Sequence, residues 1–300
     1  MTLLINGIKK KFDNHLAVDG VTLKVEKGEM FGMLGANGAG KTTSFRMILG
    51  LLDPTEGQVT WNGERITYKR THLVGYLPEE RGLFPKLTVK EQLIYLMRLK
   101  GMKKPEIIKE MRHWLERFQV PEYENKKLEE LSKGNQQKIQ FLAAVLHKPE
   151  LLILDEPFSG LDPVNSDMLK KAVLDLQKTG TTIVFSSHQM RNVEELCEDL
   201  IMLKRGKPVL QGNLRDIKRS YGMKSISIRA DYELDFIHSI SGVIEIEKHR
   251  DGATVKVENE RVAEDIFQKI TEKGFVRKFE IEEPSLHDIF IDKVGGDADE

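Results

Sequence analysis

The sequence has almost no cysteine, and this scarcity limits its chemistry. Cys197 is the single cysteine among 300 residues, so the chain cannot form an internal disulfide. It lies in VEELCEDL, a helical pattern that favours a buried thiol in a reducing compartment. The composition therefore excludes a fold held together by its own disulfides.

Long apolar runs are also missing. No segment approaches the roughly 20 apolar residues that cross a bilayer. The first residues, MTLLINGIKKKF, place their charges after a short apolar stretch, which is not the order of a signal peptide. We therefore expect a cytoplasmic protein that reaches a membrane only through a partner.

Net charge is small, at −1 for the whole chain, but it is unevenly distributed. Residues 1–220 carry 35 basic against 28 acidic residues, and residues 221–300 carry 11 against 19. This asymmetry predicts two modules with different partners. The basic excess of the first module suits a polyphosphate or lipid headgroups, although a solvated face needs no partner.

The pattern of apolar residues predicts the fold of the first module. LLINGIKKKF (3–12) and AVDGVTLKVEKGE (17–29) alternate as antiparallel strands do. MFGMLG (30–35), LLILD (151–155) and TTIVFSSH (181–188) are nearly continuous apolar runs, with helical patterns between them. Such strands are typical of a mostly parallel α/β sheet that helices cover on both faces. The early alternating strands would form an antiparallel flank.

Spacing and composition also predict the domain limits. We expect a first domain over residues 1–216, with an all-helical insert at about 88–131. A linker over 217–222, a small α+β domain over 223–294 and a disordered tail over 295–300 would follow. The β-α-β-β-α-β order of elements in the small domain is typical of a ferredoxin-like sandwich.

A glycine loop supplies the strongest chemical signal. GANGAGKTT (35–43) matches G-x-x-x-x-G-K-[ST] between an apolar strand and a helix. Its glycines let the backbone close around phosphates, while Lys41 adds positive charge and Thr42 offers a hydroxyl to Mg²⁺. An ordinary glycine turn is the alternative. The expected nucleotide-binding residues are Gly35, Asn37, Gly38, Ala39, Gly40, Lys41, Thr42 and Thr43.

Acidic side chains follow a buried strand in LLILDEP (151–157). Asp155 can hold Mg²⁺ there, usually through water, and Glu156 can orient and polarise an attacking water as the catalytic base. His188 follows another strand, which should end at the same sheet edge, so we expect it to contact the γ-phosphate. The alternatives are a carboxylate pair that caps the next helix and a structural histidine.

The sequence leaves two further features open. Phe12 closes an N-terminal strand, where its ring either stacks on adenine or belongs to the core. LSKGNQQK (131–138) places serine and glycine at the start of an amphipathic helix, an arrangement that binds anions through backbone N–H groups and the helix dipole. A capped helix start in a monomer is the alternative.

The motifs GANGAGKT, LSKGNQQK, LLILDEP, SGLD (159–162) and SSH occur in this order. Together they resemble an ATP-binding cassette (ABC) ATPase, the nucleotide-binding subunit of an ABC transporter. The resemblance covers residues 2 to about 220 and implies a P-loop NTPase core that uses Mg²⁺ with ATP. The last 80 residues, ending in EPSLHDIFIDKV, resemble the extra C-terminal domain of ATPases from the sodium-, drug- and ABC-2-type exporter branch.

The resemblance implies that two cassettes, identical or different, stack head to tail. The signature residues that would complete the other cassette's site are Ser132, Lys133, Gly134 and Asn135. They would contact the γ-phosphate bound at Lys41 of the partner subunit, and Asp162 would sit at the same interface. Loss of the γ-phosphate would remove a contact that favours closure, so hydrolysis would drive reopening.

Several positions depart from the family pattern. Lys133 and Asn135 replace glycine and glutamine of the usual Leu-Ser-Gly-Gly-Gln, and we expect a working signature. Glu79, in GYLPEERGLF, stands where the family has a metal-contacting glutamine, so whether it ligates Mg²⁺ stays open. Phe12 occupies the place of a common stacking tyrosine, which favours the adenine contact.

The resemblance implies partners as well as chemistry. A groove between the 88–131 insert and the core would receive a cytoplasmic helix of a separate membrane permease, and ATP hydrolysis would drive transport, by export. The protein would then be peripheral on the inner face of the cell membrane. The alternatives are a soluble ABC ATPase acting on the ribosome or nucleic acid, and a regulatory nucleotide-binding module.

Three observations argue against those alternatives. The chain has one glycine loop, and the 114 residues from Lys41 to Asp155 contain no heptads. The Asp155-Glu156 pair is intact. We therefore expect no nucleic-acid partner. In the C-terminal domain, one apolar stripe predicts a second dimer or regulatory contact. Its residues are Leu286, Ile289, Phe290 and Val294.

Overall fold

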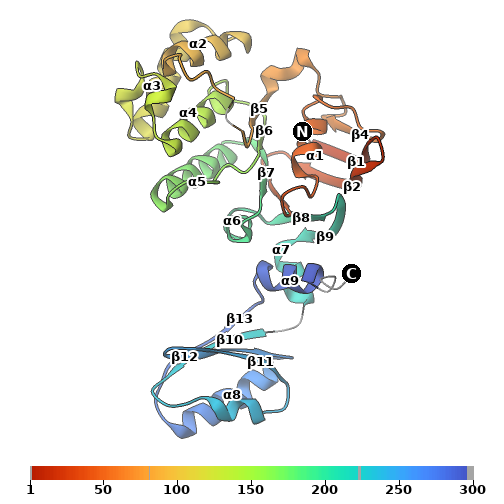
Figure 1. The fold of residues 1–300 in the computed structure, drawn as a ribbon, viewed down its shortest axis with the longest axis vertical. Coiled ribbons are helices and arrows are strands. Elements are labelled where there is room, and N and C mark those ends of the chain that lie inside the picture. Colours follow the sequence, from red (N-terminus) through yellow and green to blue (C-terminus); the bar gives the residue numbers. More distant parts are fainter. Residues whose placement is uncertain (1, 81, 222–223, 296–300) are drawn as a thin grey trace. The chain divides into compact units, whose positions relative to one another are not determined.

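The chain forms two units. The computed structural model describes residues 2–80, 82–221 and 224–295 (Figure 1). The first unit is Met1–Gln211 and the second is Gly212–Glu300. Each unit has its own sheet and its own apolar core, as separate domains do.

A three-stranded antiparallel sheet opens the first unit, in the order β2-β1-β4. Its strands are β1 (Thr2–Phe12), β2 (His15–Glu26) and β4 (Glu56–Trp61). Leu3 and Ile5 of β1 are fully buried, whereas Leu4 between them is exposed, because successive side chains of a strand point to opposite faces. This sheet is the predicted antiparallel flank.

A six-stranded sheet forms the centre of the first unit, in the order β5-β6-β7-β3-β8-β9. The strands are β3 (Met30–Leu34), β5 (Val74–Leu77), β6 (Leu151–Leu154), β7 (Thr182–Ser187), β8 (Asp199–Lys204) and β9 (Lys207–Asn213). The pairs β3–β7, β3–β8, β5–β6 and β6–β7 are all parallel. Every residue of β3, β6 and β7 is buried, as strands covered on both faces are. The predicted mostly parallel sheet is confirmed.

Helices cover this sheet. They are α1 (Lys41–Ile48), α4 (Lys133–Val145), α5 (Pro163–Lys178) and α6 (Met190–Leu196). Figure 1 shows α1 on one side of β5, β6 and β7, with α4 and α5 on the other. Cys197 directly follows α6 and is buried as predicted, which raises the pKa of its thiol. Because parallel strands end at the same edge, the loops after β3, β6 and β7 converge.

Helices occupy the segment for which the sequence predicts a helical insert. It consists of α2 (Val89–Leu99), α3 (Lys104–Arg117) and the 3-10 helices Pro121–Tyr123 and Leu128–Glu130. The Trp114 ring lies 5.6 Å from that of Phe118 and 5.8 Å from that of Phe141, centroid to centroid. Phe141 belongs to α4, so these aromatic contacts fix the insert to that helix. A further 3-10 helix, Tyr68–Leu73, precedes β5.

The second unit is built on a four-stranded antiparallel sheet in the order β11-β12-β10-β13. The strands are β10 (Lys224–Ala230), β11 (Val243–His249), β12 (Gly252–Val257) and β13 (Val276–Glu282). Helix α8 (Glu260–Lys273) packs Ile266 and Ile270 into a core with Ile228 and Val255 of the sheet. The predicted order of elements is found, but the first helix is only a 3-10 helix, Asp235–Ser239.

The prediction of a linker over residues 217–222 is wrong. Helix α7 (Leu214–Ser220) occupies most of that stretch. Asn213 caps it by accepting a hydrogen bond from the Arg215 N–H at 3.1 Å, and Leu214 and Ile217 are buried. Only two apolar residues anchor this short, charged helix, which is why its sequence resembles a linker. The unit boundary accordingly precedes it, after Gln211.

The apolar stripe near the C-terminus, which was predicted to form a second contact, lies largely inside the chain. Leu286 and Ile289, on helix α9 (Leu286–Gly295), are fully buried within the chain, and Phe290 is half-buried. Covered side chains leave little surface for another molecule. The Val294 side chain and the predicted tail residues 296–300 lie outside the described residues. Gly295, expected in that tail, is the last residue of α9.

Candidate phosphate-binding site

The glycine loop between β3 and α1 has a backbone that other residues would strain. Gly35, Gly38 and Gly40 have φ angles of 154°, 80° and 102°. A Cβ at Gly40 would lie 2.6 Å from the Ala17 carbonyl oxygen, and one at Gly35 would lie 2.7 Å from that of Leu203. Both approaches are shorter than van der Waals contact, so these two positions require glycine for space as well as conformation.

A hairpin that sequence reasoning did not single out supports this loop. Arg205 and Gly206, in the turn between β8 and β9, have φ angles of 48° and 82°, as a two-residue type I′ turn requires. The Gly206 N–H donates to the Ala39 carbonyl at 3.1 Å, and the Gly206 carbonyl accepts from the Asp19 N–H at 2.9 Å. The hairpin therefore joins the glycine loop to β2. The sequence signal that could have predicted this turn is the Arg-Gly pair between two strand-like segments.

Helix α1 presents its first turn to the mouth of the loop. Its N-cap, Gly40, supplies no side-chain hydrogen bond, and the first turn contains no acidic residue. Asn37 and Gly38 are exposed, while Thr42 and Thr43 are half-buried. An uncapped helix N-terminus next to an exposed glycine loop is suited to phosphate, because backbone N–H groups and the helix dipole both attract anions.

Lys41 lies between the loop and the acid pair. Its Nζ donates to the Gly35 carbonyl at 2.7 Å and to the Ala36 carbonyl at 3.2 Å. The same Nζ is 3.4 Å from Glu156 Oε1, and both side chains are buried. The structure thus brings the predicted cation and the predicted base into one contact.

Asp155 is fully buried directly after β6. Its Oδ1 accepts a hydrogen bond from the Ser186 hydroxyl at 2.6 Å. Burial raises the pKa of the Asp155 carboxyl; hydrogen bonding by Ser186 and Thr42 opposes the rise, and the Glu156 charge adds to it. Ser186 also accepts the Glu156 N–H at 3.0 Å, so one hydroxyl positions both acids. Sequence reasoning missed Ser186, although it stands two residues before His188.

Glu156 has an unusual backbone. Its φ angle is 50°, in the left-handed region that non-glycine residues seldom occupy. Its Oε2 forms a hydrogen bond with His188 Nδ1 at 2.8 Å. The Glu156 side chain is 4% exposed and that of His188 is 46% exposed, so the histidine connects a buried carboxylate to the surface.

The residues present fit a magnesium ion. Asp155 Oδ2 and Glu156 Oε1 are buried oxygen atoms without a well-formed hydrogen bond from the described residues. Burying such acceptors is costly unless another group compensates. Asp155 and Thr42 offer oxygen atoms, which are the ligands that Mg²⁺ prefers.

The predicted signature residues lie at the start of α4. Ser132 is its N-cap and accepts the Asn135 N–H at 3.4 Å, while Asn135 Nδ2 donates to the Tyr123 hydroxyl at 2.9 Å. Ser132 and Lys133 are exposed, and Gly134 and Asn135 are half-buried. Figure 1 shows α4 and the phosphate-loop helix α1 on opposite sides of the central strands, so the structure does not bring the signature to its own glycine loop.

Asp162 caps the neighbouring helix. Its Oδ1 accepts the Asn165 N–H at 3.0 Å at the start of α5, and hydrogen bonding by Asn165 lowers the pKa of the Asp162 carboxyl. A Cβ on Gly134 would lie 3.3 Å from Asn165 Nδ2. Asn165 therefore lies between the predicted interface aspartate and the signature loop.

Glutamines on the buried side of α4 join three segments, and sequence reasoning missed them. Gln137 Nε2 donates to the Pro157 carbonyl at 3.1 Å, just after the acid pair. Gln140 Nε2 donates to the carbonyls of Pro78 and Glu80, each at 3.0 Å. The sequence signal that could have identified them is the presence of polar residues on an otherwise buried helix face, in QQKIQ. The signature helix is thus hydrogen-bonded to the loops after β5 and β6.

Glu79 and Phe12 are both on the surface. Glu79 is exposed between the two carbonyls that Gln140 binds. Burial raises the pKa of Tyr76 to about 12, and the charges of Asp155 and Glu79 contribute. Phe12 is 45% exposed and has Lys10 Nζ at 5.2 Å from its ring centroid. Its ring is therefore not part of the core.

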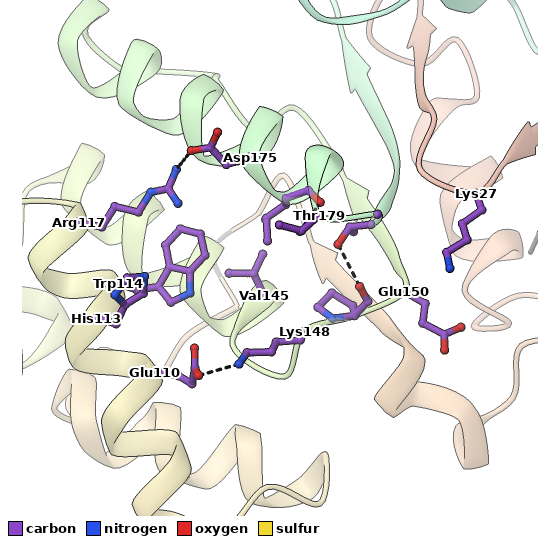
Figure 2. A pocket seen from close by; sticks show the side chains of 14 residues that line it. Lys27, Glu110, His113, Trp114, Arg117, Val145, Lys148, Glu150, Asp175 and Thr179 are labelled. Carbon is purple, nitrogen blue, oxygen red and sulfur yellow. Dashed lines mark hydrogen bonds and ion pairs between the residues drawn. The ribbon is translucent and has the colours of Figure 1, made fainter.

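A separate cleft of about 530 Å³ lies away from these loops (Figure 2). It is lined by α3, by α5 and by residues just before β6 and β7, hence at the opposite edge of the sheet. Two ion pairs lie in its lining, since Arg117 pairs with Asp175 and Lys148 Nζ lies 2.7 Å from Glu110. Arg117 also stacks over the Trp114 ring at 4.9 Å.

A glycine loop before a helix, with an acid pair and a histidine at the ends of neighbouring parallel strands, defines a P-loop nucleotide-binding protein. A family model described as ABC transporter matches residues 18–159. A second, described as ATP-binding protein DrrA1-3-like, C-terminal domain, matches residues 212–294.

Similar proteins agree with this classification. The ABC transporter ATP-binding protein YhaQ of Bacillus subtilis is 58% identical over 293 residues, covering 98% of each chain. The linearmycin resistance ATP-binding protein LnrL of the same organism is 31% identical over 305 residues, again covering 98% of each. A solved structure of the ATP-binding subunit of an ABC transporter has a TM-score of 0.69 and 30% identity, covering 74% of this chain and 94% of that one.

The chain belongs to the ABC transporter family and is an ATP-binding subunit with a DrrA-like C-terminal domain. The predicted family and fold class are confirmed, and so is the predicted role as the ATP-binding subunit of an ABC transporter. ATP-binding subunits of this family dimerise and work with membrane permeases. In the part of the chain that the structure describes, no helix has the length and apolar character to cross a bilayer.

We predict that Asp155→Asn raises the melting temperature of the nucleotide-free protein and weakens Mg²⁺-dependent ATP binding. Asparagine keeps an oxygen that accepts the hydrogen bond from Ser186. It also removes a buried negative charge, and the raised pKa of Asp155 indicates that this charge destabilises the folded protein. The stability gain should be present at pH values above the folded pKa. It should vanish as the pH falls below the unfolded pKa, where both states of the wild type are protonated.

Calorimetry across the pH range measures the stability, and titration with Mg-ATP measures the binding. Asp167→Asn, at an exposed position on α5, is the matched control and should change neither. A melting temperature that does not rise at neutral pH would show that the buried charge carries no cost.

Proposed function

We propose that this subunit hydrolyses Mg-ATP and thereby drives export through membrane subunits that are separate polypeptides. The observation that carries the proposal is the environment of Glu156, which contacts Lys41 through one carboxylate oxygen and His188 through the other. Relatives support the direction of transport by their names, which include linearmycin resistance in Bacillus subtilis and Nod factor export in Burkholderia. These names favour a transporter over a soluble ABC ATPase acting on the ribosome or nucleic acid.

Nucleotide binding rearranges the contacts of Lys41. Its Nζ is bound to two loop carbonyls and lies near Glu156 Oε1. A triphosphate brings several negative charges to the same loop, so Lys41 turns toward the β- and γ-phosphates and leaves Glu156. The exposed ring of Phe12 stacks on adenine.

Thr42 and Asp155 would hold Mg²⁺, which would neutralise charge on the β- and γ-phosphates. A nearby cation favours the ionised carboxylate of Asp155, opposing the effect of burial on its pKa. Glu79 is exposed on the loop after β5.

Glu156 acts as the general base. Released from Lys41, its carboxylate accepts a proton from the water that attacks the γ-phosphate. His188 holds Oε2 at 2.8 Å and so fixes the carboxylate rotamer, and its exposed ring can reach the γ-phosphate. Ser186 holds the strained backbone of Glu156 by accepting its N–H.

The signature acts on the nucleotide of a second subunit, whether identical or different. Ser132 and Lys133 are exposed at the N-terminus of α4, a helix that lies on the other side of the central strands from α1. With Gly134 and Asn135 they offer backbone N–H groups, side-chain donors and positive charge to the γ-phosphate held at Lys41 of the partner subunit. Asp162 lies at the same interface, where it orders Asn165 beside Gly134.

A membrane permease receives the resulting movement. Its cytoplasmic helix docks between the helical insert and the core, where Phe84 is 52% exposed and its N–H donates to Gln92. Gln140 joins α4 to the loop that leads into the insert, so closure at the signature reaches the docking site. The subunit is then peripheral on the cytoplasmic face of the membrane.

Glu156→Gln is expected to lower the ATPase rate by about 10²–10⁴-fold, since this is the usual contribution of a general base. Glutamine keeps the shape of the side chain and cannot accept the proton. The same variant should accumulate as a dimer in Mg-ATP, seen by light scattering. Glu106→Gln, an exposed glutamate of α3, serves as the control. Unchanged turnover in Glu156→Gln would refute the assignment of the base.

In the Glu156→Gln background, Gly134→Asp should abolish the ATP-dependent dimer while ATP binding persists. The added carboxylate would face the γ-phosphate of the second subunit but not the chain's own nucleotide. Equilibrium dialysis measures binding, and sedimentation velocity measures the dimer. If ATP binding is lost along with the dimer, the signature acts on its own site instead. Gln268→Glu, at an exposed position on α8, is the control for added charge.

Purification of the tagged subunit from detergent-solubilised membranes should recover a multi-span permease. Phe84→Asp should reduce that recovery, because it places a charge in the proposed docking groove. Leu51→Asp changes an even more accessible apolar residue outside the groove and should leave recovery unchanged. Recovery of ribosomes or DNA instead of a permease would contradict the transport function.

A further inference from the structure

The sheet of the second unit has one open edge at β13. Within the described residues, β13 pairs with β10 on one side and forms the end of the order β11-β12-β10-β13. Its register with β10 is regular from Lys278 to Glu282. An edge strand exposes backbone N–H and C=O groups, so a straight edge is a template for pairing with another strand.

Apolar side chains gather along the same edge. Phe275, just before β13, is 75% exposed, and Ile281 within it is 44% exposed. Phe267 of α8 is 46% exposed and packs on Phe279 of β13, with ring centroids 4.9 Å apart. Single exposed apolar residues are ordinary, but a group of them beside an unpaired strand marks an interaction surface.

The charges of β13 make the strand complementary to itself. Its sequence, VRKFEIE, places Arg277 and Lys278 before the central Phe279, and Glu280 and Glu282 after it. When two such strands pair in antiparallel fashion about Phe279, Lys278 lies opposite the partner's Glu280. The symmetry repeats this contact, so opposite charges face each other twice.

The geometry of these two charges allows that exchange. Lys278 Nζ and Glu280 Oε2 lie 2.6 Å apart within one chain, so both side chains are on the same face of the sheet. They are 39% and 54% exposed. Each of these two side chains can therefore leave its partner within the strand and contact the oppositely charged side chain of a second strand, at little cost in free energy.

The other edge of the sheet lacks this property. β11 carries Glu245 and Glu247 on either side of Ile246, so pairing with its own copy about Ile246 would oppose glutamate to glutamate. Each edge strand has one register shift, between Val243 and Glu245 in β11 and between Val276 and Lys278 in β13, so the charges and not the register distinguish the two edges. Of the two edges, β13 is the one suited to a second copy.

We propose that two copies of this chain associate through antiparallel pairing of β13 with β13. The contact is isologous, extends the four-stranded sheets into one continuous sheet, and buries the apolar group at the edge. It involves none of the nucleotide-binding residues, so it holds two subunits together without ATP.

Charge reversal tests the proposal in the full-length chain without nucleotide or Mg²⁺. Lys278→Glu and Glu280→Lys each place like charges in both symmetry-related pairs, so each should weaken the dimer by about tenfold or more in sedimentation equilibrium. The double variant Lys278→Glu/Glu280→Lys restores opposite charges and should regain wild-type affinity. Asp265→Lys, exposed on α8 on the side away from Phe267, is the matched control and should dimerise normally.

These outcomes can be told apart from those for the nucleotide-dependent dimer, the ATP sandwich, in which the signature of each subunit contacts the ATP of the other. A wild-type chain that stays monomeric up to about 100 μM without ATP would overturn the β13 contact and leave the sandwich intact. Equal dimerisation of wild type and both single variants would overturn it too. So would a double variant that melts like the wild type and yet remains as weak as the single variants.

Discussion

The burial of two adjacent carboxylates beside one lysine is the constraint on which the site depends. Asp155 and Glu156 follow a strand with no exposed residue, and buried charge is tolerated only with partners. Ser186 supplies the common partner from the neighbouring strand, and Lys41 supplies the positive charge from the glycine loop. The parallel pairing of β6, β7 and β3 is what brings these three sources to one edge. The strand pairing that forms the central sheet is therefore also what assembles the site.

Helix α4 connects this edge to the rest of the first unit. One end carries the exposed signature residues, and the aromatic Phe141 within it anchors the helical insert. Between them, Gln137 and Gln140 bind the backbone of two loops that flank the site. A displacement at either end of such a helix acts on both loops through hydrogen bonds to main-chain atoms, which do not depend on the side chains those loops carry.

Much of this could be predicted from sequence because the motifs are local. The glycine loop, the acid pair and His188 each follow an apolar strand, and parallel strands end together, so their meeting was predictable. Other site residues act through contacts between segments that are far apart in the sequence, and the spacing of residues along the chain does not show which segments meet. These are Ser186, Gln137, Gln140 and the Arg205-Gly206 turn. Helix α7 was missed because two buried residues in a charged stretch resemble a linker. The α9 stripe was correctly seen as apolar, but a single sequence does not distinguish a face covered within the chain from a face that awaits a partner.

The solitary thiol has a practical consequence. Cys197 is enclosed beside β3 and its pKa is raised, so it resists both alkylation and oxidation while the fold is intact. Any cysteine placed on the surface would thus be the sole reactive sulfur on a native subunit. Spin labels or fluorophores could be attached at one chosen point per chain, and inter-subunit distances followed through the catalytic cycle without first removing a native residue.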